Sequence, residues 1–510
     1  MIIRLDNVKL SVTRPESDLI KIAEGKLKAK VAYFKILKKS LDARDKRNLF
    51  WLYSIAFSKE AQTEADRQFE RVKNPPKIAV IGGGPAGLFC AVRLVQHGVA
   101  PIIIERGEKV EERRESCLKF FNGGVLDVHS NVQFGEGGAG AFSDGKLNTR
   151  TKDGLNVDVL ALFHKFGAPE DVLYLNKPHV GSDRLYGVLQ NLRNFVTENG
   201  GRYMFDTLLT GIEATGGALH TLRLRNVKSG KTEELTVDAA VLAVGHSARD
   251  TFGMLNDSGV YMEPRDFAVG VRIEHLAQSI NAAQYGEACK YLPAADYQLV
   301  SHAHERTAFT FCMCPGGVVI PAASEEGGVV VNGMSLRARD GRNSNSALMV
   351  QMRKSDFGDD LFAGVRFQRA LENRAFSIAS DYRAPVQLVG DFLKDRLSDG
   401  FGEVKPTYAG GTVFAPLGEI LPGVAVSALK AAIPDMGRRL KGFDSGAAVM
   451  TGVETRFSSP LKIVRGEDLQ SVSLKNLYPC GEGSGYSGGI TSSAADGMKV
   501  AERLFERFNA

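Results

Sequence analysis

The chain has 510 residues, of which 64 are Lys or Arg and 59 are Asp or Glu, so its formal net charge is +5. A charge this small does not indicate a protein whose main partner is a polyanion. At roughly 150 residues per domain and 44% apolar residues, the chain can form about three domains with cores of their own, which excludes intrinsic disorder. Its 55 glycines indicate many places where backbone approaches something closely.

Export and membrane insertion are not expected. The chain has no run of about 18 apolar residues, and its first residues lack the apolar stretch of a signal peptide. The six cysteines contain no C-x-x-C pair, unlike a secreted disulfide framework or a zinc module. They are Cys90, Cys117, Cys289, Cys312, Cys314 and Cys480. A reducing cytoplasm fits this pattern best.

The first 75 residues are predicted to form a small basic α+β domain. They hold 17 Lys and Arg against 10 Asp and Glu, a net charge of +7. Their apolar patterns predict a strand over 2–12, a helix over 17–28 and strands over 31–37 and 49–57. A polar helix is expected over 58–73, and Asn74-Pro75-Pro76 then ends it and marks a domain boundary.

From Lys77 onward, short apolar strands alternate with helices, which predicts a parallel sheet covered on both faces. Residues 262–399 are rich in Val and Thr and are predicted to form antiparallel strands, for example over 307–311 and 318–320. The expected fold is therefore a Rossmann-like α/β domain over 76–261 and 400–510. A mainly antiparallel β substrate domain is inserted into it at 262–399.

One motif carries most of the functional interpretation. The strand over 77–81 leads into Gly82-Gly83-Gly84-Pro85-Ala86-Gly87, which satisfies G-x-G-x-x-G and opens a helix. Gly82 makes the tight turn, Gly84 lets a pyrophosphate approach the backbone, and Gly87 lets the helix pack on the strand. The pyrophosphate then lies at the positive end of the helix dipole. The motif predicts a dinucleotide-binding site. The alternative is a doubly wound sheet that binds no nucleotide.

The next strand, over 101–104, ends in Glu105, which lies 18 positions after Gly87. Its carboxylate can accept hydrogen bonds from both hydroxyls of an adenosine ribose. Because it would repel a 2′-phosphate, NADP is not expected at this site. At the other end of the chain, a strand over 477–482 enters a glycine-rich loop and a helix from about Ile490 to Phe508. A flavin requires this additional element, because N–H groups at a helix start can face the ring edge that becomes negative on reduction.

These residues resemble the two-dinucleotide-binding-domain flavoproteins, and within them a family of FAD-dependent dehydrogenases. Residues 240–245 are similar to the superfamily's internal strand, and Gly481-Glu482 stands where it usually has Gly-Asp. The resemblance to the FAD-dependent dehydrogenase family is carried by segments 134–146, 311–317 and 452–460. The resemblance implies FAD and an oxidoreductase but brings no established substrate.

The motif and the resemblance together assign a set of residues to FAD. They are Gly82, Gly84, Pro85, Ala86, Gly87, Glu105, Arg106, Gly137, Gly138, Lys146, Gly245, Gly481, Glu482, Gly488, Gly489 and Ile490. The loop over 135–145 either wraps the flavin, with Lys146 near the phosphate or the ring edge, or forms a flexible surface lid.

Cys312 and Cys314 are the candidate catalytic residues. In a regular strand both thiols point to one face, where they could act as acid, nucleophile or redox partner beside the flavin. Plain burial is the alternative, because free cysteine behaves as a small apolar residue. Arg272 and His275 either meet an anionic substrate or lie on a solvated strand end. Glu454 and Arg456 form either part of the flavin site or an internal ion pair.

A metal site is not expected, because His302, His304 and Glu305 have no further ligand cluster in the sequence. Nucleic-acid binding by the basic N-terminal domain is also not expected. Its aromatic residues are mixed with apolar neighbours, as in a core rather than a stacking platform. They are Tyr33, Phe34, Phe50, Trp51 and Tyr53. A docking or dimerisation role, and with it a homo-oligomer, fits that domain better.

The sequence therefore predicts a cytoplasmic FAD-dependent oxidoreductase that passes a hydride between flavin N5 and a small organic substrate. No second G-x-G-x-x-G follows a strand, so NAD(P)H would reach the flavin only transiently, if it is the electron donor. Two other classes stay open. One is a flavin-containing protein that modifies or binds RNA, and the other is a non-catalytic scaffold that binds NAD.

Overall fold

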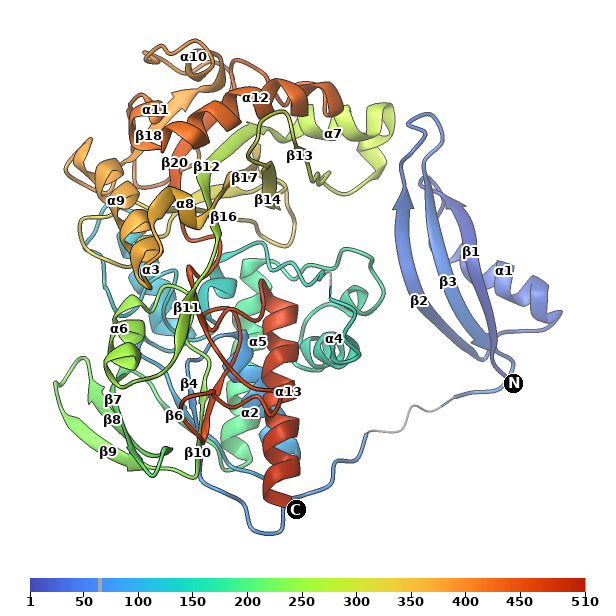
Figure 1. The fold of residues 1–510 in the computed structure, drawn as a ribbon. Helices are drawn as coiled ribbons and strands as arrows, with labels where there is room; N and C mark the ends of the chain where they lie inside the picture. The colour runs from blue at the N-terminus through green and yellow to red at the C-terminus, as the bar shows by residue number, and fades with distance from the viewer. Residues whose placement is uncertain (63–66, 150, 510) are drawn as a thin grey trace.

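The computed structural model describes residues 1–62, 67–149 and 151–509. The first unit stands beside the rest of the molecule at the end of a long connection (Figure 1). Its three strands pair antiparallel in the order β1-β3-β2. Its elements are β1 (Ile3–Ser11), α1 (Asp18–Leu27), β2 (Tyr33–Asp42) and β3 (Phe50–Ser58). The predicted α+β unit is present with its elements in the expected order.

Three of the five aromatic residues named above lie in the core of this unit. Tyr53 is buried with Leu10, Leu19 and Phe57, and Trp51 and Phe34 pack against that cluster. The unit touches the body through its edge strand β2, where the Lys39 N–H donates to the Tyr174 carbonyl at 2.7 Å.

The predicted helix over 58–73 is wrong for its described residues, which are extended or irregular. Backbone groups of this segment form hydrogen bonds with the body of the protein instead. The Val72 N–H donates to the His97 carbonyl at 2.9 Å, and His97 Nδ1 lies 2.8 Å from the Glu70 carbonyl oxygen. Phe69 stacks against Arg93, whose guanidinium lies 4.7 Å from the ring centre. The connection is therefore held by the body of the protein rather than by its own helical bonds.

Five strands of the described chain form a parallel sheet in the order β22-β10-β4-β5-β6. Strand β22 comes from the last forty residues and completes a sheet begun by β4, so the two parts of the chain form one domain. The strands are β4 (Ile78–Ile81), β5 (Ile102–Ile104), β6 (Arg202–Met204), β10 (Ala239–Leu242) and β22 (Leu477–Pro479). This arrangement confirms the Rossmann-like α/β fold.

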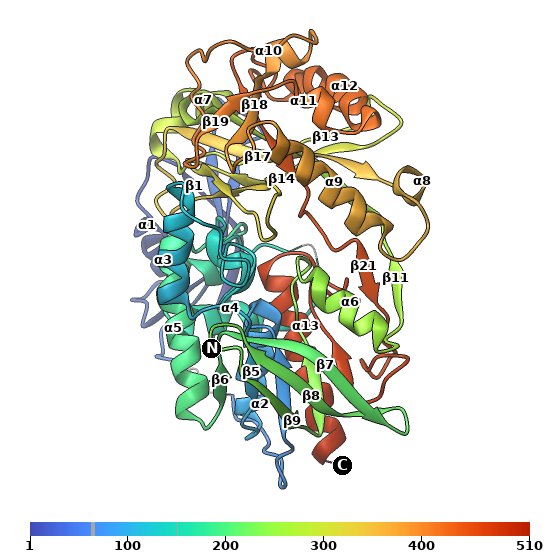
Figure 2. The ribbon, with the colours of Figure 1, turned by 90° about the vertical axis from the view of Figure 1, so that its left-hand side faces the viewer.

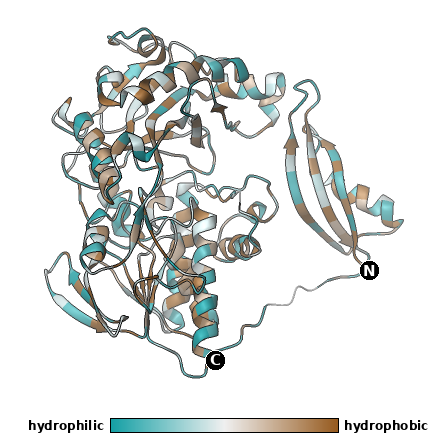
Figure 3. Cartoon of the chain, viewed as in Figure 1, coloured by the Kyte–Doolittle hydropathy of each residue, from teal (hydrophilic) through white to brown (hydrophobic). Residues whose placement is uncertain are grey.

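Helices cover one face of this sheet and an antiparallel meander covers the other. The meander consists of β7 (Thr207–Thr215), β8 (Ala218–Asn226) and β9 (Thr232–Thr236). The helices of this domain are α2 (Pro85–Gln96), α3 (Val110–Phe121), α4 (Leu155–Lys165), α5 (Ser182–Glu198), α6 (Arg249–Asp257) and α13 (Ile490–Asn509). Along α13, apolar and polar stretches alternate, as expected for a helix with one buried face (Figure 3).

The second unit is built on a sheet of seven described strands, in the order β13-β14-β17-β12-β20-β18-β19. Its neighbours are antiparallel except for β18 and β19. The strands are β12 (Phe267–Leu276), β13 (Val300–Ser301), β14 (Ala308–Cys314), β17 (Asn343–Met352), β18 (Ala384–Leu388), β19 (Thr412–Phe414) and β20 (Val449–Glu454). A separate pair is formed by β15 (Val318–Pro321) and β16 (Val331–Met334).

The helices of this unit flank the sheet. They are α7 (Ala277–Tyr285), α8 (Lys354–Phe357), α9 (Ala363–Ser377), α10 (Val389–Phe392), α11 (Leu417–Ile420) and α12 (Gly423–Arg439). Short 3₁₀ turns cover Gly138–Phe142, Glu170–Leu173 and Gly286–Tyr291. Because β19 and β20 both belong to this sheet, one on each side of β18, the predicted boundary between residues 399 and 400 is wrong. Residues 412–454 lie in the inserted unit.

Two paired strands connect the units. Strand β11 (Met262–Pro264) leaves the first domain and β21 (Leu461–Ile463) returns to it, antiparallel and side by side (Figure 2). A buried ion-pair network also crosses between the units. Arg249 on α6 and Arg456 both bind the carboxylate of Glu372 on α9, at 2.9 Å and 2.8 Å. Burial opposes ionisation of Glu372, but the charges of Arg456 and Arg249 lower its pKa to about 2.

Replacing this carboxylate tests the network. We expect Glu372→Gln to lower the free energy of unfolding by about 3–5 kcal/mol, because two buried guanidinium groups lose their common counter-charge. Glu233→Gln, on the exposed edge of β9, is the matched control and should change it by less than about 0.5 kcal/mol. Urea unfolding followed by circular dichroism measures both, and equal midpoints would contradict the role given to Glu372.

Candidate functional site

Two glycines of the first loop have a steric reason in the structure. Gly82 has a φ of +108°, and a Cβ there would lie 2.4 Å from the Ala243 carbonyl oxygen. A Cβ at Gly87 would lie 1.9 Å from the Gly82 carbonyl oxygen. Gly84, by contrast, would meet only the Gly138 Cα at 3.8 Å. Helix α2 begins here with no side-chain cap, so the loop leaves N–H groups available to an anionic ligand.

Glu105 lies at the carboxyl end of β5, buried under this loop. Its carboxylate accepts hydrogen bonds from the N–H groups of Gly83 at 2.6 Å, Gly107 at 2.9 Å and Gly135 at 3.0 Å. These bonds fix the carboxylate beside the dinucleotide loop. The neighbouring Arg106 instead pairs with Asp250 at 2.8 Å and lies over the Phe134 ring, so its contacts are structural.

The second glycine loop packs directly against the first. The Gly137 N–H donates to the Gly83 carbonyl at 2.8 Å, and a Cβ at Gly138 would lie 3.1 Å from the Gly84 Cα. Most of residues 131–147 are buried, which does not fit the flexible surface lid considered above.

A single guanidinium fixes this loop. Arg113 on α3 is fully buried and donates to five backbone carbonyls at 2.6 to 3.2 Å. The accepting carbonyls belong to Asn131, Val132, Gly135, Glu136 and Gly138. The planar fork of Arg suits this fixed set of acceptors, whereas the single ammonium of Lys would not.

Three glycines face open space at the edge of the parallel sheet. Gly245 follows β10, and Gly488 and Gly489 precede α13, and all three are exposed. A Cβ at any of them would find no atom within 4 Å. We call these three glycines and Gly84 the cradle: they are positions on the loops that follow β4, β10 and β22 where the backbone is open to a flat ligand.

The other predicted cofactor residues lie behind this cradle. Pro85, Gly137 and Ile490 border a small apolar cavity of about 20 Å³. Ala86 is buried, and a Cβ at Gly481 would lie 2.7 Å from the Ala86 Cβ, so these two residues serve packing.

Glu482 and His246 face each other beside the cradle. His246 Nδ1 lies 3.6 Å from Glu482 Oε1. Desolvation raises the pKa of Glu482 to about 7, although its bond from the Gly489 N–H opposes this. Desolvation likewise lowers the pKa of His246 to about 3, so the imidazole is neutral at pH 7. The sequence analysis missed His246, although its place directly after Gly245, at the carboxyl end of a parallel strand, was a usable signal.

The cysteines lie on an irregular part of β14. The register with β17 shifts between Phe311 and Cys314, and Cys312 has a φ of +41°, a left-handed conformation that costs free energy in a non-glycine residue. The expected regular alternation is therefore absent here. The Cys314 thiol instead donates to the Cys312 carbonyl oxygen at 3.3 Å.

The cysteines lie among charged groups. Arg272 is fully buried and donates to the Cys312 carbonyl at 3.0 Å, with the same nitrogen 3.6 Å from Cys314 Sγ. It also binds Glu454 at 3.3 Å, and Lys146 Nζ donates to the Met313 carbonyl. The bond from Lys146 joins β14 to the second glycine loop, and Thr491 at the start of α13 donates to the carbonyl of the next loop residue, Leu147, at 2.7 Å.

The structure decides several open alternatives. Arg272 does not lie on a solvated strand end, because β12 is an interior strand of its sheet. His275 is also buried, and its Nε2 lies 2.8 Å from the Phe443 carbonyl oxygen. Glu454 and Arg456 form two separate ion pairs, with Arg272 and Glu372 respectively, rather than one with each other. In the part of the chain that the structure describes, no group of three or more His, Cys, Asp or Glu is placed to hold a metal.

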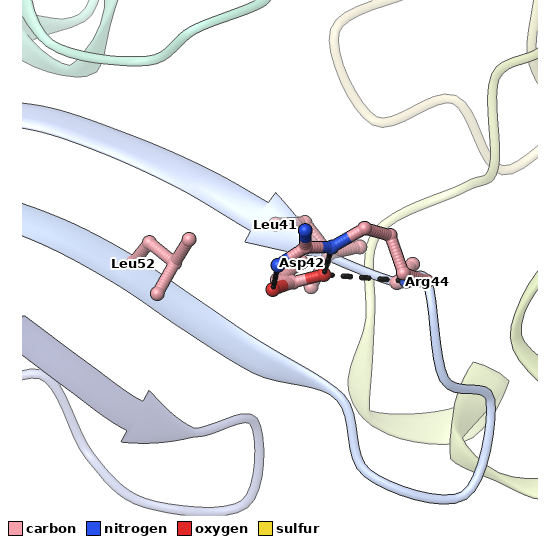
Figure 4. Close-up of a pocket in the computed structure, with 5 residues that line it drawn as sticks. Leu41, Asp42, Arg44 and Leu52 are labelled. Carbon is pink, nitrogen blue, oxygen red and sulfur yellow. Dashed lines mark hydrogen bonds and ion pairs between the residues drawn. The ribbon is translucent and has the colours of Figure 1, made fainter. Parts of the chain in front are cut away.

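A separate depression of about 340 Å³ lies in the N-terminal unit. It is lined by Leu41, Asp42, Ala43, Arg44 and Leu52 (Figure 4). Figure 4 shows the Arg44 guanidinium turned onto the Asp42 carboxylate, at 2.6 Å. Its charged groups satisfy each other and no glycine loop borders it, so it is not the candidate site. Among the described residues, no helix is long and apolar enough to cross a membrane.

The reactivity of Cys312 tests this geometry. The hydrogen bond from Cys314 lowers the pKa of the Cys312 thiol to about 6, and the charges of Arg272 and Lys146 act in the same direction. Since the thiolate is the reactive form, alkylation of Cys312 by iodoacetamide should rise with pH through about 6. In Cys314→Ala the midpoint should move upward, toward the value of about 8.5 for a free thiol. Peptide mass spectrometry measures both rates, and an unchanged midpoint would contradict the role of Cys314.

Comparison with known proteins identifies two matching family models. One, described as "FAD-dependent protein, C-terminal domain-like", matches residues 266–457. The other, described as "Pyridine nucleotide-disulphide oxidoreductase", matches residues 76–278. A Clostridium beijerinckii protein described as uncharacterized is 43% identical over 540 residues, covering 100% of this chain and 99% of its own.

Solved structures with a similar arrangement share little sequence with this chain. The FAD complex of glycerol-3-phosphate dehydrogenase from Bacillus halodurans is 11% identical, covering 86% of this chain and 65% of its own, with a TM-score of 0.36. A flavoprotein/dehydrogenase from Cytophaga hutchinsonii is 11% identical, covering 85% and 78%, with a TM-score of 0.38.

The two family models together match most of the chain after residue 75, and the full-length relative matches all of it. The chain belongs to a family of FAD-dependent proteins of the oxidoreductase type, and FAD is its cofactor.

Proposed function

We propose that the protein is an FAD-dependent dehydrogenase or reductase that moves a hydride between flavin N5 and a small organic substrate. The observation that carries the proposal is the meeting of two units at one place. The cysteine strand β14 of the inserted unit meets the second glycine loop, where Lys146 donates to the Met313 carbonyl, and Thr491 at the start of α13 donates to the carbonyl of Leu147 in the same loop. A substrate bound there would contact both.

The chain's own residues would hold FAD in a simple way. The N-terminus of α2 and the loop at Gly84 would bind the pyrophosphate, and Glu105 would accept hydrogen bonds from the adenosine ribose. Gly488 and Gly489, before α13, would let the flavin approach the backbone. When bound, FAD supplies the hydride acceptor or donor.

Side chains near the cradle would transfer the protons of the reaction. Cys312 is the partly accessible thiol of the pair and can take a proton from a substrate hydroxyl or return one. Glu482 carries a pKa near neutrality and can hold a second proton next to His246. Arg272 positions the cysteines rather than meeting substrate, because its side chain is fully buried.

A side chain placed in the cradle tests the proposed FAD position. We expect Gly245→Leu to fold with the wild-type melting temperature of the apoprotein but to weaken FAD binding by more than about 100-fold, because the new side chain occupies space that the cofactor needs. Gly187→Leu, within α5, is the control, because its Cβ also meets nothing within 4 Å. Flavin fluorescence titration measures both affinities. Equal affinities would exclude this placement of FAD.

The electron source is tested by anaerobic mixing. The purified protein should be yellow and should bleach near 450 nm when the reducing substrate is added. NADH or NADPH is proposed as a transient donor. Bleaching by one of them, saturating with concentration, would support a reductase, whereas no bleaching by either would assign the electrons to the organic substrate. A protein without flavin absorbance after FAD addition would overturn the proposed function.

A further inference from the structure

One phenylalanine of β14 is exposed directly before the first cysteine. Phe311 keeps 39% of its surface accessible, and in the part of the chain that the structure describes it is the one exposed phenylalanine. A single exposed apolar side chain is ordinary on a protein surface. The surroundings of Phe311 therefore decide whether its exposure has a function.

Phe311 belongs to a group of three aromatic rings that come from two segments. Its ring centre lies 4.5 Å from that of Phe457, in an edge-to-face arrangement. The Phe309 ring lies 5.5 Å from the same Phe457 ring, and both pack on a buried cluster that contains Ala347 and Met349. The Phe311 ring is thus held by its neighbours while much of it stays accessible.

Phe457 lies beside the cradle, in the segment that leads from β20 to β21. Two residues after it, the Ser459 hydroxyl donates to the Gly483 carbonyl at 3.0 Å. Gly483 in turn packs on the loop after β10, since a Cβ there would lie 2.7 Å from the carbonyl carbon of Gly245. The contact between Phe457 and Phe311 therefore joins the surroundings of the cradle to the cysteine strand.

The cations bound to these two segments are already held by protein groups. Arg272 is paired with Glu454 at 3.3 Å. Arg456, directly before the second ring, is paired with Glu372 at 2.8 Å. Lys146 donates to a backbone carbonyl of β14. An anionic substrate group at the rings would compete with these partners, and a charge removed from water without a partner is costly, whereas an uncharged ring would disturb none of them.

We propose that Phe311 and Phe457 form the binding surface for an uncharged aromatic or conjugated ring of the substrate. Flat rings gain an additional attraction when they stack offset or edge to face, and the accessible Phe311 ring offers such a contact beside the cradle. This inference rests on the proposed function, because it concerns the substrate of the same FAD site. It goes beyond that function by naming the chemical class of the substrate.

Three small probes of similar size distinguish the classes of ligand. Benzamide has an uncharged aromatic ring, benzoate carries a negative charge on the same ring, and cyclohexanecarboxamide keeps the amide on a saturated ring. Each is titrated into the FAD-loaded wild-type protein while the flavin absorbance at about 450 nm is followed. Benzamide should bind at least about 10-fold tighter than benzoate. It should bind about 2- to 10-fold tighter than cyclohexanecarboxamide.

Variants locate this preference at the two rings. Phe311→Leu and Phe457→Leu should each make the affinities for benzamide and cyclohexanecarboxamide nearly equal, because the side chain stays apolar but the ring is lost. Phe311→Tyr keeps a ring and should keep the wild-type preference. The control is Phe401→Leu, which removes a ring from a separate aromatic pair, 4.6 Å from Phe414, and should match wild type.

The wild-type titrations decide the inference without any variant. Equal affinities for benzamide and cyclohexanecarboxamide, no binding of benzamide, or tighter binding of benzoate would each overturn it and leave the FAD-dependent function standing. A preference for benzamide that survives in both leucine variants would also overturn it, because the ring would then bind elsewhere. A protein that takes up no FAD would refute the proposed function instead.

Discussion

Helix α13 lies directly on the backbone of α2, and the site depends on this contact. A Cβ at Gly497 would come within 2.0 Å of the Ala86 carbonyl oxygen, so no other residue fits without moving one helix. Both helices follow parallel strands of one sheet and start at the same edge of it. Their close packing therefore brings two helix N-termini, hundreds of residues apart in the chain, to the same edge of the sheet.

The position of the second unit is coupled to the cradle. Its connection through β11 and β21 and its buried pairing of Arg249 with Glu372 set where β14 lies relative to the first domain. Because Arg249 belongs to α6, shortly after Gly245, the residues that anchor the second unit and the residues that face the cofactor lie on one short segment. A displacement of the two units relative to each other would therefore also displace the residues that face the cofactor.

The sequence predicted what local rules determine. The glycine loop, Glu105 and the last strand and helix have residue types that steric and electrostatic needs dictate position by position. Other features depend on partners that no local pattern reveals. A fully buried strand such as β20 is equally apolar in either sheet, so its place could not be read from its residues. The polar segment after Ser58 has helical composition, but its backbone bonds to the His97 loop instead. The burial of Arg272 follows from two neighbours of β12 that lie far along the chain, β17 and β20.

The paired strands β11 and β21 also mark the boundary between the two units. The Arg265 N–H donates to the Pro460 carbonyl at 2.8 Å, so the chain enters and leaves the second unit at adjacent points. Nearly two hundred residues therefore form a closed excursion whose two ends meet. Such a topology is what the insertion of one gene segment into a loop of another leaves behind, and it explains how the nucleotide-binding sheet remains continuous around so large an interruption.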